Sequence, residues 1–145
     1  MKQAIIFLLF SIIIFSCNEK RKNHISDDLS AARERASKDT TSVQLIDSVY
    51  NFGTVTEGEK VEFSYRFKNI GAKPLVISET HASCGCTVPQ TPDKPILPGE
   101  VGFIKVVFNS AGKAKDHIEK TITVQANTKP GFPDLLLTGN VAEEK

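Results

Sequence analysis

Apolar and polar residues alternate strictly from residue 61 to residue 68. The apolar positions are Val61, Phe63, Tyr65 and Phe67, and the polar positions between them are Glu62, Ser64, Arg66 and Lys68. A period of two places successive side chains on opposite faces of a β-strand. The pattern therefore predicts a strand that buries the four apolar side chains and exposes the polar ones to solvent.

Five further segments have strand-like composition or alternation. They are Val43–Phe52, Leu75–Thr80, Val101–Phe108, the segment in which Ile118, Ile122, Val124 and Ala126 share one face, and Leu135–Val141. Glycine, proline and asparagine residues separate these segments, as turns require. Six or seven short strands in about 100 residues, without a convincing helix, predict an all-β domain. We expect an immunoglobulin-like antiparallel β-sandwich of about seven strands, with a small barrel as the alternative.

The chain before residue 43 has a different composition. Ala4–Phe15 is apolar apart from Ser11 and follows Lys2. A charged start and an apolar run of roughly 7–15 residues are typical of a secretory signal peptide, whereas a transmembrane helix needs about 20 apolar residues. The polar residues after it bury too little surface to fold. The predicted organisation is a signal peptide at 1–16, a polar spacer at 17–42, the sandwich at 43–142 and a tail at 143–145.

The end of the apolar run suggests a lipid anchor. Ser16 directly precedes Cys17, and a small residue before a cysteine resembles the bacterial lipobox, in which the cysteine carries diacylglycerol and becomes the new N-terminus. An ordinary signal peptide with a cysteine near its cleavage site is the alternative. Each buried methylene contributes about 0.8 kcal/mol, so several acyl chains would hold the protein on a membrane. We expect a lipidated Cys17 and a place in the cell envelope, facing the periplasm rather than the cell surface.

The charge balance argues against a nucleic-acid partner. The sequence has 18 Lys and Arg residues and 17 Asp and Glu residues, and loss of residues 1–16 removes only Lys2, which leaves 17 of each. Proteins that bind nucleic acid carry a basic face, because they must neutralise phosphates. We therefore expect no nucleic acid among the partners.

Several short motifs follow one another in a fixed order. They are Phe52–Val55, Phe67–Gly71, Pro74–Ile77, Ser83–Thr87 and Ile96–Glu100. This order and spacing resembles the bacterial family called domain of unknown function 1573, from about Asp47 to Val141. That family is similar to Hydin-like immunoglobulin-type sandwiches and is common among secreted proteins and lipoproteins. The resemblance implies an envelope lipoprotein with this fold, and it implies no catalytic activity, because the family has none that is accepted.

Cys84 and Cys86 are the reactive residues of the predicted domain. A bridge needs Cα atoms roughly 4.4–6.8 Å apart, and Gly85 between the two cysteines permits a turn that meets this range. Outside the cytoplasm a close pair is usually oxidised. So small a loop stabilises the fold little and is easily reduced. The first interpretation is a structural pair, either bridged or reduced and packed.

Two other interpretations of the pair stay open. Two thiolates favour a soft ion such as Cu(I), and His81 is a third possible ligand in the pattern His81-x-x-Cys84-x-Cys86. A structural zinc site takes four ligands, and only three candidates are local. The remaining interpretation is a thiol–disulfide exchange site formed by the same two cysteines.

The sequence contains no recognisable catalytic motif. It has no Gly-x-Ser-x-Gly, no His-Glu-x-x-His and no phosphate-binding glycine-rich loop. We therefore expect a non-enzymatic binding or interaction module without a cofactor, whose partner is an envelope protein or glycan. Because loops on a rigid scaffold carry function, the long irregular segment Cys84–Pro98 is the candidate surface. Copper handling and thiol–disulfide redox chemistry are the alternatives.

Overall fold

The structure is a computed structural model that describes residues 31, 34–35 and 38–143. The predicted signal peptide, Cys17 and most of the spacer lie outside the described residues, as do the last two residues of the tail. The chain divides into two units, Met1–Glu34 and Arg35–Lys145. In the first unit only Ala31 and Glu34 are described, and both have helical backbone. Among the described residues, no helix has the length and apolar character needed to cross a bilayer.

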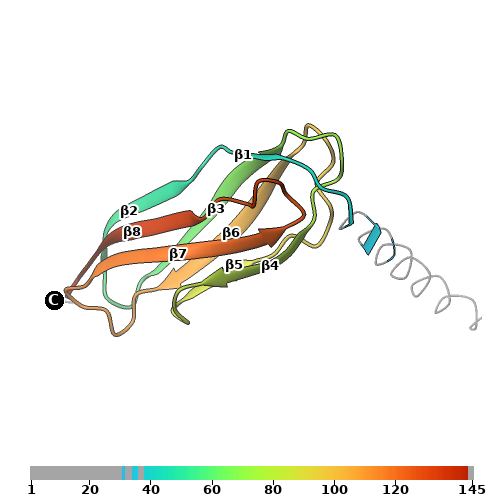
Figure 1. Ribbon diagram of the computed structural model, residues 1–145. Helices are drawn as coiled ribbons and strands as arrows, with labels where there is room; N and C mark the ends of the chain where they lie inside the picture. Colours follow the sequence, from blue (N-terminus) through green and yellow to red (C-terminus); the bar gives the residue numbers. More distant parts are fainter. Residues whose placement is uncertain (1–30, 32–33, 36–37, 144–145) are drawn as a thin grey trace, which may run out of the picture. The chain divides into compact units, whose positions relative to one another are not determined.

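Eight strands in the second unit form two four-stranded sheets (Figure 1). The first sheet has the order β1 (Val43–Leu45), β3 (Lys60–Asn69), β6 (Val101–Asn109) and β5 (Thr87–Gln90). The second sheet has the order β2 (Val49–Thr56), β8 (Leu135–Ala142), β7 (His117–Ala126) and β4 (Ile77–Ala82). The inner faces of the two sheets share one apolar core. The predicted all-β sandwich is confirmed.

The sequence predicted a sandwich that is antiparallel throughout, but the structure contains one parallel pair of strands. The predicted strand Val43–Phe52 forms two strands on different sheets, because β1 pairs with β3 whereas β2 pairs with β8. Between them, the backbone N–H groups of Ile46 and Asp47 both donate to the carbonyl of Arg66, after which the chain crosses to the second sheet. After this short connection, β2 pairs with β8, and the two strands run parallel.

Strand boundaries differ from the prediction at two other places. Gly53 does not end a strand: its φ of 73° allows a bulge inside β2, and its N–H donates to Asn51 Oδ1 at 2.8 Å. The segment Cys84–Pro98 is not irregular throughout, because β5 lies within it and pairs with β6. The alternation of apolar and polar residues predicted neither the bulge at Gly53 nor β5, because a bulge interrupts the alternation and a four-residue edge strand is too short to show it.

The alternating strand β3 has the predicted orientation. Tyr65 and Phe67 are fully buried and Val61 is buried, whereas Phe63 is half-buried and stacks on Tyr50 with ring centroids 3.8 Å apart. The four polar residues between them are exposed. The Tyr65 hydroxyl donates to the carbonyl of Leu136 at 2.8 Å and so links the two sheets. Burial, together with the nearby Tyr50 and Asp47, raises the pKa of Tyr65 above its usual range.

Aromatic rings cover two glycines on the inner faces of the sheets. Phe67 pairs across strands with Gly102, and a Cβ at Gly102 would collide with the Phe67 ring and approach Ile96. In the second sheet, a Cβ at Gly139 would collide with the ring of Phe52. The missing side chains thus leave room for rings, since protein interiors are close-packed.

Candidate functional site

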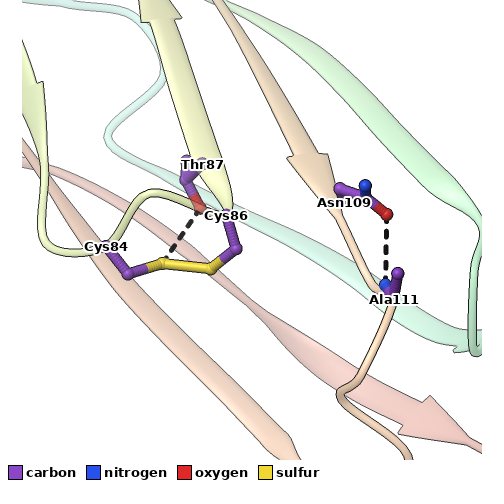
Figure 2. Close-up of a disulfide and its surroundings, with 5 residues drawn as sticks. All are labelled: Cys84, Cys86, Thr87, Asn109 and Ala111. Carbon is purple, nitrogen blue, oxygen red and sulfur yellow. Dashed lines mark hydrogen bonds between the residues drawn. A yellow bond between two sulfur atoms is a disulfide. The ribbon is translucent and has the colours of Figure 1, made fainter.

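The predicted cysteine pair forms a disulfide in the connection between β4 and β5 (Figure 2). The Cα atoms are 5.4 Å apart, within the range that a bridge requires. Both cysteines are half-buried, and Cys86 packs against the edge of the core. The Cys86 carbonyl accepts a hydrogen bond from the N–H of Asn109, which ties the loop to the end of β6. The Thr87 hydroxyl lies 3.9 Å from Cys84 Sγ.

His81 pairs with a carboxylate on its own strand. Its Nε2 lies 2.7 Å from Glu79 Oε1, and both side chains are more than half exposed. Among the described residues, no three His, Cys, Asp or Glu side chains gather into a group that could hold a metal ion. The structure thus brings Cys84 and Cys86 together but does not assemble them with His81 as a ligand set. Copper binding stays a prediction.

A second feature of the surface was not identified from the sequence. Five large apolar side chains, each between 43% and 55% exposed, gather on the outer side of the first sheet. We call this group the outer patch, and its members are Ile46, Ile70, Leu97, Val101 and Phe103. Only two other large apolar side chains of the described chain are similarly exposed, Val49 and Val88.

The strand register places three members of the outer patch, Ile46, Val101 and Phe103, on either side of β3. Across β3 and β6, Phe103 pairs with Arg66 and Val101 pairs with Lys68. Ile46 lies on the other side of Arg66, because its N–H donates to the Arg66 carbonyl. The patch therefore crosses three neighbouring strands or strand ends. Val101 and Phe103 are neighbours on one face of β6, and the charged side chains of β3 lie between them and Ile46. The patch is therefore a mixed apolar and basic surface, in contrast to single exposed apolar residues scattered over a protein.

Ile70 and Leu97 join the patch through two loops that are fastened together. The Asn69 N–H donates to the Glu100 carbonyl, and the Gly99 N–H donates to the Asn69 carbonyl. The buried Asn69 side chain donates to the carbonyls of Lys73 and Ile96 and accepts from the Thr41 hydroxyl. Because these bonds satisfy a buried amide from both loops, they hold the patch in one arrangement.

Two of the basic residues around the outer patch form ion pairs, and Lys68 does not. Arg66 makes a two-pronged ion pair with Asp47, with Nε–Oδ2 at 2.7 Å and Nη2–Oδ1 at 3.0 Å. The hydrogen bonds from Arg66 lower the pKa of Asp47. Further along the same face, Lys105 Nζ lies 2.6 Å from Glu62 Oε2. Lys68 is exposed at the centre of the patch and has no ion-pair partner among the described residues.

One signal for the outer patch was present in the sequence. In β6, Val101, Phe103 and Val107 point away from the core, and Ile104, Val106 and Phe108 point into it. A strand that is apolar on both faces is typical of a strand covered on both faces. The predicted strand is confirmed, and the excess of apolar residues on its outer side is the signal in the sequence for the patch.

Comparison with known proteins identifies the family. The sequence model for the family described as protein of unknown function (DUF1573) matches residues 43–141. The chain belongs to this family. The matched region of this DUF1573 protein contains all eight strands apart from the last residue of β8. No curated protein matches the chain.

Solved structures with a similar fold support the sandwich. A protein of unknown function from Porphyromonas gingivalis W83 has a TM-score of 0.60 at 14% identity, covering 72% of this chain and 48% of that one. The DUF1573 chain thus spans about half the length of that protein. A human CEP192 ASH/PapD-like domain has a TM-score of 0.54 at 11% identity, covering 73% and 89% of the two chains. The YadV chaperone reaches 0.50 at 12% identity, covering 69% and 52%. At these identities the likeness concerns the fold alone.

Proposed function

We propose that this DUF1573 protein is an envelope lipoprotein, anchored through lipid on Cys17, whose sandwich is a non-enzymatic module that binds an envelope protein. The observation that carries the binding role is the outer patch. Contiguous exposed apolar surface on a rigid scaffold marks an interaction site in soluble domains, because leaving it in water is unfavourable. An apolar patch fits a protein partner better than a glycan, whose surface is covered with hydroxyl groups.

The proposed surface differs from the one expected from the sequence. The segment Cys84–Pro98 shares only Leu97 with the outer patch, and the disulfide lies at the other end of β6. Val101 begins β6 and Asn109, bonded to Cys86, ends it, so along the strand Val101 lies ~27 Å and Phe103 ~20 Å from the disulfide end. The two are therefore separate candidates, and the apolar surface supports the binding role.

The anchor is tested by replacing the modified residue. Cys17→Ser should move the full-length protein from the membrane fraction into the soluble fraction, because the thioether link to lipid is lost. Mass spectrometry of the wild-type N-terminus should show a lipid-modified Cys17. A mature wild-type protein that still begins at Met1 would contradict the proposed anchor.

The binding role is tested by placing a photo-crosslinking phenylalanine analogue at position 103 of the full-length protein in its native cells. We expect a discrete protein adduct, because Phe103 is 54% exposed and is the aromatic member of the patch. The matched control carries the analogue at Thr123, an exposed residue of β7 in the second sheet. Adducts of the same size and yield at both positions would show that the patch has no special role.

A further inference from the structure

We infer that the partner surface docked by the outer patch is acidic, with apolar side chains that cover Val101 and Phe103 and a carboxylate that meets Lys68. The inference rests on the proposed function and adds the chemistry of the partner. It comes from the distribution of charge on the outer side of the first sheet, where Arg66 and Lys105 are paired with carboxylates, whereas Lys68, the lysine beside the patch, is not.

The acidic side chains next to the patch are already engaged. Asp47 is held by both prongs of Arg66, and Glu62 is held by Lys105. The Glu100 carboxylate accepts from the N–H of Leu97 at 2.9 Å. Lys68 stands beside Val101 in the register without an anionic partner among the described residues. A partner that covers Val101 must also cover Lys68, and an unpaired charge is costly to bury.

The Arg66–Asp47 pair adds no net charge beside Phe103, so Lys68 is the cation that a partner meets there. Arg66 pairs with Phe103 in the register, and 53% of its side chain is exposed. Phe103 is the aromatic member of the patch, and aromatic side chains near the centre of an interface supply much of the binding energy. A carboxylate on a partner that covers Phe103 meets Lys68 on the next row, beside Val101.

Two other occupants fit these observations less well. A second copy of the chain, related by two-fold symmetry, would bring the same patch onto itself and place Lys68 near its own counterpart. An anionic membrane would be attracted only weakly, because Arg66 and Lys105 are already paired with carboxylates and two lysines, Lys60 and Lys68, remain on this face. A protein surface can place one carboxylate at Lys68 and apolar side chains around it, so electrostatic complementarity favours it.

The experiment uses the crosslinking analogue at position 103 in the full-length protein and changes the charge at Lys68. Lys68→Glu should lower the yield of the adduct roughly tenfold or more, because a like charge would face the partner's carboxylate. Lys60→Glu is the matched control: this lysine lies on the same strand and face, at the opposite end, and its reversal should leave the yield unchanged. Raised salt should weaken crosslinking of the wild type more than that of Lys68→Gln.

The possible outcomes separate the two proposals. Absence of any adduct at position 103 would overturn the binding role itself. An adduct whose yield is unchanged or raised by Lys68→Glu would leave the binding role intact and overturn the acidic partner. An adduct of twice the chain mass, or one carrying phospholipid, would overturn it in favour of a second copy or a membrane. Unchanged urea midpoints of both lysine variants exclude unfolding as the cause of a lost adduct.

Discussion

The two sheets each have four strands, but the side chains exposed on their outer faces differ in chemistry. Half of the exposed positions of β2, β4, β7 and β8 are threonine, asparagine, glutamine or serine; the carboxylates are Glu79 and Glu119, and none is a lysine or arginine. The outer face of the first sheet carries Lys60, Arg66, Lys68 and Lys105 together with most of the exposed apolar side chains. The second face is suited to water, and the first is suited to a partner.

This difference shows which part of the sandwich is free to serve function. Both sheets need apolar inner faces, since these form the shared core and supply the stability of a small domain. Stability makes no such demand on an outer face, so an outer face that is apolar as well needs another explanation. If the outer patch stabilised the fold, its apolar side chains would need no partner to explain them.

The largest expected effect separates the inner and outer sides of the first sheet. Phe67→Ala should lower the free energy of unfolding by about 3–5 kcal/mol, because the ring is fully buried and covers Gly102. Phe103→Ala should change it by no more than about 0.5 kcal/mol, because its side chain is mostly in solvent. Urea unfolding measures both variants. A loss of several kcal/mol from Phe103→Ala would mean that the patch is structural.

A smaller effect tests how tightly the inner side is packed beneath the patch. Gly102→Ala should cost about 1–3 kcal/mol, because the new Cβ must displace the Phe67 ring. Gly131→Ala is the control, since a Cβ there meets nothing within 4 Å. Thermal or urea unfolding of the pair gives the comparison. Equal stability of the two variants would show that the core under β6 has spare room.

The disulfide should matter less than the core. Closing so short a loop removes little chain entropy, so Cys84→Ser combined with Cys86→Ser should cost less than about 2 kcal/mol. Reduction of the wild type should add about two mass units and expose two titratable thiols. Crosslinking at position 103 should not change, because the bridge lies at the far end of β6. Loss of the adduct on reduction would instead link the disulfide to the binding face.

The smallest expected effect concerns the ion pair beside the patch. Asp47 has a lowered pKa through its hydrogen bonds with Arg66, so the pair stabilises the fold above the unfolded pKa of about 3.9. That contribution is lost as the pH falls through the lower folded pKa. The stability difference between wild type and Asp47→Asn should therefore be small at neutral pH and shrink on acidification. Arg66→Gln should remove the same pH-dependent component, and a difference that grows in acid would contradict the pairing.

The cysteine pair could be predicted from the sequence because its geometry is local. Two cysteines separated by one glycine can reach bonding distance in almost any loop. The outer patch could not be predicted in this way, because its members come from four separate stretches of the chain. The pairing of β3 with both β1 and β6, and the bonds by which Asn69 joins two loops, bring Ile46, Ile70, Leu97 and Phe103 onto one surface.

The sequence by itself determined the fold class and the inner face of β3, because alternation with a period of two fixes which side chains are buried wherever one face meets a core. It did not determine the crossing of residues 43–56 from one sheet to the other, the parallel pair of β2 with β8, or the bulge at Gly53. Those features depend on which strand lies beside which, and a strand's own residues do not specify its neighbour. The outer patch depends on the same information, so the tertiary structure alone placed the surface that we propose for binding.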